Sequence, residues 1–364
     1  PQLLSVFDSL IFSENKYKYD QRILDWTLRI TQYNCRFPGA GFVFNNAGGY
    51  SGRYSRSMAQ CLDAFDIGAK VSFDQGDYLT YLACLSNKVV LAFSAGLELE
   101  KVQGFSKDLQ VILISCGEFV SAGKYYPKII DNLMGVSPFG LLDRKYFTDI
   151  QWEMLSNSAI YGAYHHLRLL EYFWNARYVS IVEHYKTEKN EIEKIRGIAQ
   201  VDDNHFIYAI SCLQCGEVNG VFFEEAMECI KDLARTYPPN FHHKWLLVQA
   251  EKCRINDDVK ATDFYQKAAI DAKENGFIHM YALTHELHAR YWQAQGRPDY
   301  MKYHITKAMQ GYQRWGCVLK LENLYDEFSQ FLDFNSSISN YMSCSNTASI
   351  NESTDSVGRA SLQG

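Results

Sequence analysis

The 364-residue sequence has little proline, no long apolar run and no excess of positive charge. Its seven prolines fall mostly at expected element ends, which favours long helices over many short strands, since proline interrupts a helix interior. No stretch of 18 apolar residues occurs and no basic segment precedes an apolar one, so neither a membrane span nor a secretory signal is predicted. The net charge of −6 argues against nucleic-acid binding, which needs clustered Lys and Arg.

The ten cysteines are scattered along the chain without a pattern of close pairs. Most lie inside apolar helical patterns, where cysteine acts as a small buried hydrophobe. This distribution is typical of a reducing compartment and predicts a cytoplasmic protein without a disulfide framework. The chain begins with Pro1 and not with Met, so we expect a segment of a longer protein.

The C-terminal third contains an internal repeat. Residues 267–276 align with residues 307–316 at an offset of 40, which also aligns Leu247 with Leu287. Small residues recur at Ala268 and Ala308, where paired helices approach closely, and glycines recur where helices should end. The pattern predicts two antiparallel helix pairs, with helices over 242–254, 258–275, 279–295 and 298–315.

These helix pairs predict an all-α fold, a tetratricopeptide-like solenoid of antiparallel helix pairs. We assign residues 1–334 to this helical-repeat region, with the clearest repeats at 242–276 and 282–316. Residues 335–364 are rich in Ser and Asn and poor in apolar residues, so we expect a disordered linker or tail.

Further helices are indicated upstream of these repeats. In the segment 222–233, Ala226, Ile230 and Leu233 share one face, and Pro238-Pro239 should end that helix. Residues 74–78 are typical of a turn between two repeat helices. The charged stretch 187–196 predicts a solvated helix face or a mobile loop, and the apolar run 111–114 predicts a buried helix.

The segment His285-Glu286-Leu287-His288 is the strongest candidate for chemistry. A zinc-protease helix needs two His residues four apart with a Glu between them, whereas the spacing here is three. The same segment is similar to the phospho-acceptor box of histidine kinases, but the Arg-Thr-Pro part of that box is missing. We therefore expect a helix that carries two partly exposed histidines.

Other motifs are weaker. Cys212-Leu213-Gln214-Cys215 is a single CxxC without a second close pair, so buried packing is favoured over zinc or redox chemistry. The glycines between Gly39 and Gly52 lack the Lys-Ser/Thr of a phosphate loop and predict a loop between helices. The pairs His165-His166 and His242-His243 have no evident carboxylate or nucleophile partner. The sequence therefore predicts no catalytic, cofactor-binding or metal-binding residue.

One stretch resembles a known family. Residues 276–292, followed by Tyr312-Gln313-Arg314-Trp315-Gly316, are similar to the end of the helical middle region of large multi-domain sensor histidine kinases from fungi and some bacteria. Residues 67–69, 76–78 and 93–97 fit the same pattern, and Cys317 departs from it where Ala is expected. The resemblance covers most of residues 1–334.

The resemblance implies a non-catalytic scaffold in a two-component phosphorelay. Such a segment would couple an upstream ATPase-like module to downstream GAF and kinase domains, and ATP and Mg would bind only in those other domains. Its partners would be neighbouring domains of the same chain or a signalling protein, not nucleic acid or membrane. The alternative is a stand-alone tetratricopeptide-like module that binds a peptide or a partner helix. An independent enzyme is the third reading, and the sequence offers no constellation for it.

Overall fold

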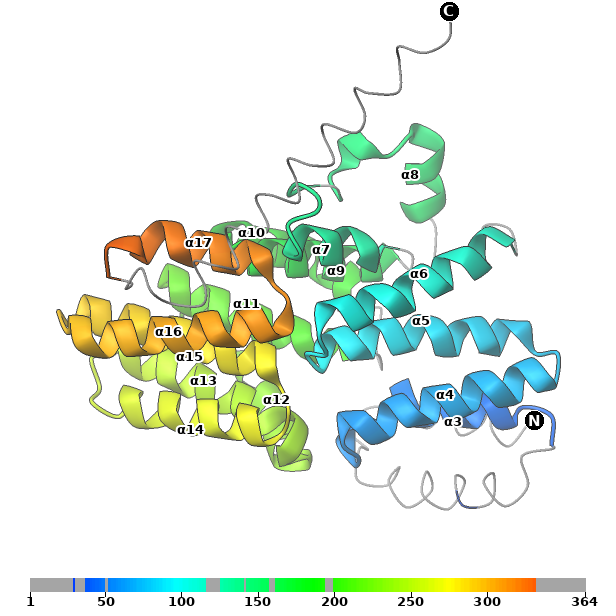
Figure 1. Ribbon diagram of the computed structural model, residues 1–364, viewed down its shortest axis with the longest axis horizontal. Helices are drawn as coiled ribbons and strands as arrows, with labels where there is room; N and C mark the ends of the chain where they lie inside the picture. The colour runs from blue at the N-terminus through cyan, green and yellow to red at the C-terminus, as the bar shows by residue number, and fades with distance from the viewer. Residues whose placement is uncertain are drawn as a thin grey trace, which may run out of the picture.

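The computed structural model describes residues 29, 37–49, 52–115, 125–140, 142–156, 161–193 and 199–331. Within these ranges the chain forms helices joined by turns, without a strand, so the fold is all-α (Figure 1). The expectation of a disordered tail over 335–364 falls outside the described residues. The longer helices are α3 (Ala40–Gly49), α4 (Met58–Asp74), α5 (Tyr78–Ser94), α6 (Leu99–Ser115), α7 (Tyr126–Leu133), α8 (Asp149–Ser156), α9 (Tyr161–Trp174), α10 (Tyr178–Glu193), α11 (Ala199–Cys215), α12 (Val221–Thr236), α13 (Pro238–Ile255), α14 (Ala261–Glu274), α15 (Ile278–Ala294), α16 (Pro298–Trp315) and α17 (Val318–Phe328).

Nine of these helices end in the same turn. At the end of α14, Gly276 has a φ of +85°, and the next amide, Phe277 N, donates a hydrogen bond to Ala272 O over 2.8 Å. This is the Schellman arrangement, which reverses the chain within a few residues and sets consecutive helices antiparallel. The left-handed residues of these nine turns are Gly76, Gly96, Gly135, Ala176, Gly216, Asp257, Gly276, Gly296 and Gly316. Successive members lie 20, 39, 41, 40, 41, 19, 20 and 20 residues apart, so the helix ends recur at multiples of about 20 residues.

The four helices predicted for the C-terminal repeats are confirmed as α13 to α16, within four residues at each end. Burial also repeats at the predicted offset of 40. The buried positions of α14 and α16 correspond in the pairs Ala261/Met301, Tyr265/Ile305, Ala268/Ala308, Ala269/Met309 and Ala272/Tyr312. The two helices therefore present equivalent faces to the core.

The glycine cluster near the N-terminus is a helix, and the prediction of a loop was wrong. Residues 40–49 form α3, which packs against α4. A Cβ on Gly41 would lie 1.9 Å from Ser72 Oγ, and one on Gly48 would lie 2.8 Å from Cys61 O. The glycines let two helices approach closely, a tertiary reason that outweighs their low helix propensity.

The other upstream predictions fared better. Asp77 caps α5 by accepting a hydrogen bond from Thr80 N, so the predicted turn over 74–78 is confirmed. The helix over 222–233 is α12, and Pro238-Pro239 both follow its end and begin α13. The run 111–114 is helical, but Val111 is 65% exposed while Leu113 is buried, so this run is buried only in part.

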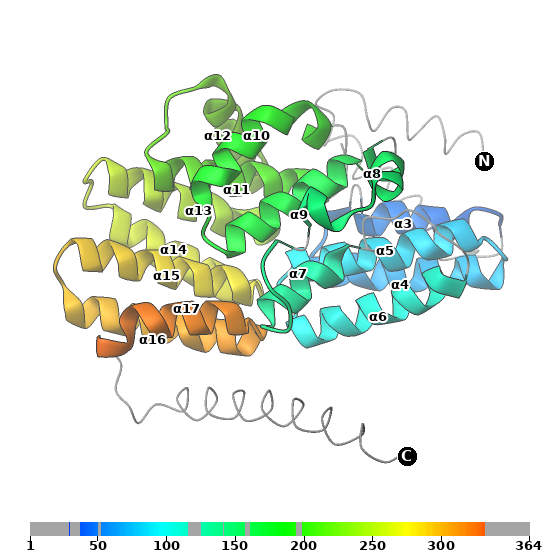
Figure 2. The same ribbon diagram turned by 90° about the horizontal axis from the view of Figure 1, so that it is seen from above.

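Early and late helices meet in the middle of the molecule. Helix α17 packs against α7, and Figures 1 and 2 show both beside the end of α5. Trp315 on α16 lies between Phe93 on α5 and Trp174 on α9, with ring centroids 5.9 Å and 4.7 Å away. The main core cluster runs from α4 to α17, and a smaller one lies between α3 and α4.

Candidate functional site at a buried helix junction

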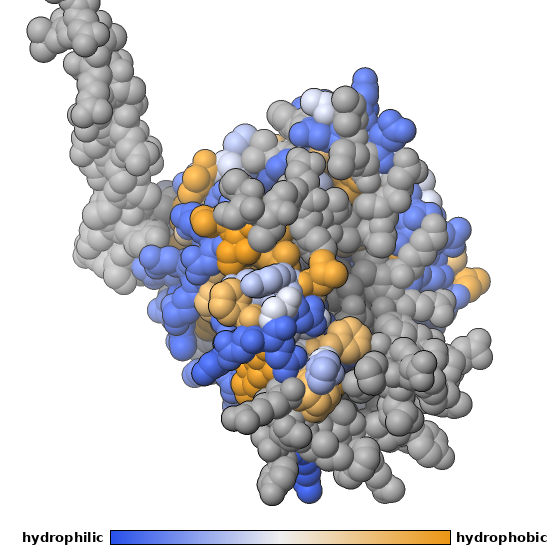
Figure 3. Space-filling model, turned by 90° about the vertical axis from the view of Figure 1, so that its right-hand side faces the viewer, coloured by the Kyte–Doolittle hydropathy of each residue, from blue (hydrophilic) through white to orange (hydrophobic). Residues whose placement is uncertain are grey.

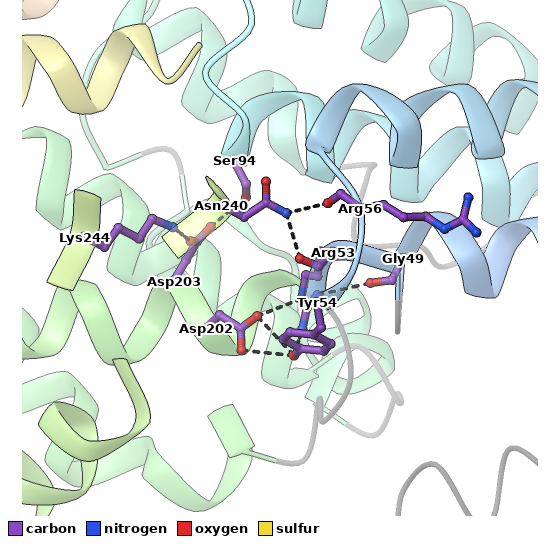
Figure 4. A network of polar contacts seen from close by, with 9 residues as sticks. All are labelled: Gly49, Arg53, Tyr54, Arg56, Ser94, Asp202, Asp203, Asn240 and Lys244. Atoms are coloured by element: carbon purple, nitrogen blue, oxygen red, sulfur yellow. Dashed lines mark hydrogen bonds and ion pairs between the residues drawn. The ribbon is translucent and has the colours of Figure 1, made fainter. Parts of the chain in front are cut away.

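Two adjacent aspartates at the start of α11 lie at the centre of this junction. Asp202 and Asp203 are buried, with 7% and 9% of their surface exposed. Neighbouring helix residues point about 100° apart, so the two carboxylates reach different helices. Figure 4 shows Asp202 turned toward Arg53 and Tyr54, and Asp203 turned toward Ser94 and Lys244.

Asp202 connects α11 to residues 53 and 54, which lie between α3 and α4. Its Oδ2 lies 2.7 Å from Arg53 Nε, and the Tyr54 hydroxyl donates a hydrogen bond to it over 3.2 Å. Arg53 also donates to Gly49 O, and Asn240 on α13 donates to Arg53 O over 2.7 Å. Burial raises the pKa of Asp202, Arg53 opposes this shift, and the like charge of Asp203 adds to it.

Asp203 connects α11 to two other helices, α13 and α5. Lys244 on α13 donates to its Oδ1, and Ser94 on α5 donates to its Oδ2 over 2.7 Å. Burial alone would raise the pKa of Asp203, but the Lys244 charge and the two hydrogen bonds hold it below its usual value. Asp203 is therefore a charged anchor inside the protein.

These groups suit a structural joint. Every charged group at the centre has a partner of opposite sign, which is what burial of charge requires. We refer to Arg53, Tyr54, Ser94, Asp202, Asp203, Asn240 and Lys244 as the buried joint. Sequence reasoning did not single out these aspartates, although two adjacent charged residues shortly before the apolar run 206–210 were an available signal.

The segment 285–288 belongs to a second buried polar centre. His285 and His288 are 8% and 1% exposed, so the prediction of two partly exposed histidines was wrong. Glu286, between them, accepts hydrogen bonds from Tyr312 Oη over 2.6 Å and from Lys320 Nζ over 3.1 Å. Burial would raise the pKa of Glu286, but Lys320 and Arg290 bring it below its usual value. The side chains of His285, Glu286 and His288 are buried because α15 packs against α13, α14 and α16.

Two histidine pairs share one geometry at an offset of 120 residues. His165 Nδ1 lies 3.1 Å from His184 Nε2, and His285 Nδ1 lies 2.8 Å from His304 Nδ1. A tyrosine four residues before the first histidine, Tyr161 in one case and Tyr281 in the other, meets that ring at 4.5 Å and 76° in both. An offset of 120 is three periods of 40, so equivalent helix pairs carry equivalent contacts.

The remaining candidate residues take structural positions. Cys212 is buried at the end of α11 and burial raises the pKa of its thiol to about 11, while Cys215 is half-buried. His166 Nδ1 lies 2.6 Å from Asn204 Oδ1, and His243 is buried against the ring of Phe277. Among the residues that the structure describes, no group of three or more His, Cys, Asp or Glu side chains is arranged to hold a metal ion.

Within the described ranges, no helix has both the length and the apolar character needed to cross a membrane. In comparisons with known proteins, no family model, no curated protein and no solved structure matches this chain.

Proposed function

We propose that this chain is a tetratricopeptide-like helical solenoid that acts through protein contacts and has no active site of its own. The observation that carries the proposal is the recurrence of left-handed helix ends at multiples of about 20 residues from Gly76 to Gly316. A fixed period of this kind is typical of helical-repeat proteins, in which each pair of helices packs on its neighbours. The equal burial in α14 and α16 and the two equivalent histidine pairs support the same proposal.

The repeat predicts that Ala268 and Ala308 respond alike to enlargement. Both are fully buried, so Ala268→Leu and Ala308→Leu should each lower the free energy of unfolding by about 1–3 kcal/mol, through overpacking. Lys267→Ala, one residue earlier on the exposed side of α14, should change it by less than about 0.5 kcal/mol. Urea unfolding followed by circular dichroism measures all three.

Unequal effects at the two alanines would contradict the repeat alignment. Lys307, which the repeat aligns with Lys267, does not provide a second exposed control. It is half-buried, and its Nζ lies 5.7 Å from the centre of the Tyr303 ring. Lys307 is thus less exposed than Lys267, although the repeat aligns the two residues.

Within this class, we propose a regulatory segment of a sensor histidine kinase in a two-component phosphorelay. The support is the resemblance of residues 93–97, 276–292 and 312–316 to that family, together with their position in space. Phe93 contacts Trp315, and a Cβ on Gly96 would lie 1.9 Å from His279 Nδ1. The two parts of the chain that resemble this family, about 180 residues apart in the sequence, thus pack on each other at the junction.

The buried joint suggests how such a segment would couple its neighbours. Charged contacts fix α11 to the N-terminal helices on one side and to α13 on the other. A displacement of α4 or α5 would then be passed to α11 and α13 and not absorbed in a flexible hinge. The proposed role is coupling of an upstream ATPase-like module to downstream GAF and kinase domains, in the cytoplasm. The seven described cysteines, all with free thiols, support that compartment.

Exposed apolar side chains support the alternative proposal, a stand-alone protein-interaction module. At the turn from α4 to α5, Phe73, Tyr78 and Leu79 are more than half exposed, and the Phe73 ring lies 6.0 Å from that of Tyr78. Figure 3 shows hydrophobic residues among hydrophilic ones on this end of the molecule. Exposed apolar side chains that lie together favour contact with another protein segment. The parent gene separates the two: a downstream His-Glu-Leu-Arg-Thr-Pro box supports the kinase segment.

The scaffold proposal predicts that the purified chain, incubated with labelled ATP and Mg²⁺, incorporates no phosphate. His285 is buried and its Nδ1 is engaged by His304, so it is closed to a phosphoryl donor. The measurement is radiolabel on the protein band after gel electrophoresis. Label that is lost in His285→Gln but kept in His242→Gln, a variant of a more exposed histidine, would overturn the proposal.

A further inference from the structure

A small cavity, open on one side, lies among buried side chains where α5, α9, α11, α13 and α15 meet. Its volume is about 30 Å³. Most of its lining is aromatic or aliphatic, and the polar groups belong to Ser94, Trp174, Asp203, Lys244 and His279. A site needs roughly 10–15 Å³ of this kind of volume to hold one water molecule. The cavity therefore has room for about two waters and for no organic ligand.

Several polar groups of the lining residues keep unused hydrogen-bonding capacity. The Lys244 ammonium has three N–H donors, and among the described residues it donates to Asp203 Oδ1. In the same part of the chain, His279 Nδ1 and Trp174 Nε1 have no hydrogen-bond partner. These three side chains are 5%, 4% and 3% exposed, so bulk solvent does not satisfy them. Leaving such groups unpaired is unfavourable, because each loses the hydrogen bonds that it makes with water in the unfolded chain.

The charge in the cavity wall favours a neutral occupant. Lys244 and Asp203 neutralise each other, and burial lowers the pKa of His279 to about 3, so that ring is uncharged at neutral pH. An ion would meet no net opposite charge, whereas water can both donate to and accept from the groups present. Apolar cavities stay dry, but polar cavities with two or more partners are filled.

We propose that this cavity is a water-binding site, in which one or two ordered waters connect Lys244 to the other unpaired groups of the lining. The waters would complete the polar contacts of α13 at the junction, beside the direct pair between Lys244 and Asp203. This inference does not depend on the proposed function.

A crystal structure of the full chain at a resolution better than about 2 Å tests the proposal. We expect one or two density peaks in the cavity, within about 3.2 Å of Lys244 Nζ and of at least one further polar atom of the lining. A cavity without density would overturn the proposal.

Crystals pressurised with xenon give a second, independent result. Xenon binds dry apolar cavities, so we expect no xenon peak at the water-binding site. The variant Leu247→Ala removes a fully buried side chain of α13 and provides an apolar cavity as a positive control. A xenon peak at the proposed site in the unaltered protein would show that it is dry and would overturn the proposal.

Discussion

Replacement of Lys244 with Met is expected to lower the free energy of unfolding by about 3–5 kcal/mol, because the change leaves Asp203 buried without its cation. Asp203 would keep the hydroxyl of Ser94, 2.7 Å away, as its one side-chain hydrogen-bond donor. A loss of this size is a large fraction of the 5–15 kcal/mol by which a typical domain is stable. Urea unfolding followed by circular dichroism measures it.

Two further variants separate the ion pair from a general effect of losing a lysine. Lys252→Met changes an exposed lysine on the same helix and should cost less than about 0.5 kcal/mol. The double variant Lys244→Met/Asp203→Asn removes both charges and should recover part of the loss, since a buried pair replaced as a whole is often nearly neutral. If Lys244→Met costs no more than Lys252→Met, the pair does not hold the junction together.

Helix positions in the C-terminal third could be predicted because the signals are local. Gly276 and Gly316 supply the left-handed turns, and Pro298 begins α16, so each boundary is set by one or two residues. The offset of 40 then followed from side chains that are buried in both copies. Upstream, the same period exists, but Ala176 takes the left-handed position that glycine usually fills. The spacing of the glycines in the sequence therefore does not reveal the repeat there.

The contacts of the buried joint could not be predicted because they connect distant parts of the sequence. Asp202 meets Tyr54, 148 residues away, and Asp203 meets Ser94, 109 residues away. Nothing within the segment 199–210 specifies those partners. The helix α3 was missed for a related reason: its glycines disfavour a helix locally, and the contact with α4 becomes evident only when both helices are in place.

Acidification is expected to unfold the protein between about pH 6.5 and pH 5. Burial lowers the pKa of nine of the ten histidines, and the six with values are His165 (about 4), His184 (about 3), His279 (about 3), His285 (about 3), His288 (about 2) and His304 (about 4). In the unfolded chain a histidine titrates near pH 6.5, so below that pH the unfolded state binds more protons than the folded one. Stability is therefore complete above the unfolded pKa and is lost as the pH falls.

The size of this effect follows from the unfolded pKa. For each histidine that stays neutral in the folded state, the free energy of unfolding falls by about 2 kcal/mol between pH 7 and pH 5. The members of a histidine pair can share one proton, so the six losses do not add in full. Even half of their sum, about 6 kcal/mol, is comparable with the whole stability of a typical domain. Circular dichroism at 222 nm against pH, with reversal on return to pH 7.5, measures the transition.

Two neighbouring histidines on α13 provide a matched test of this mechanism. His243 is 1% exposed and its ring packs on Phe277 at 4.3 Å. Among the described residues neither ring nitrogen has a hydrogen-bond partner, and the nearest carboxylate oxygen, Asp271 Oδ2, lies 3.9 Å from Nδ1. Burial lowers its pKa well below the usual value, so His243→Phe should keep the packing and remove about 2 kcal/mol of the loss between pH 7 and pH 5. The acid midpoint should move to lower pH. His242→Phe changes the adjacent, more exposed ring and should leave the midpoint in place. Equal midpoints in both variants and the unaltered chain would mean that buried histidines do not drive the acid transition.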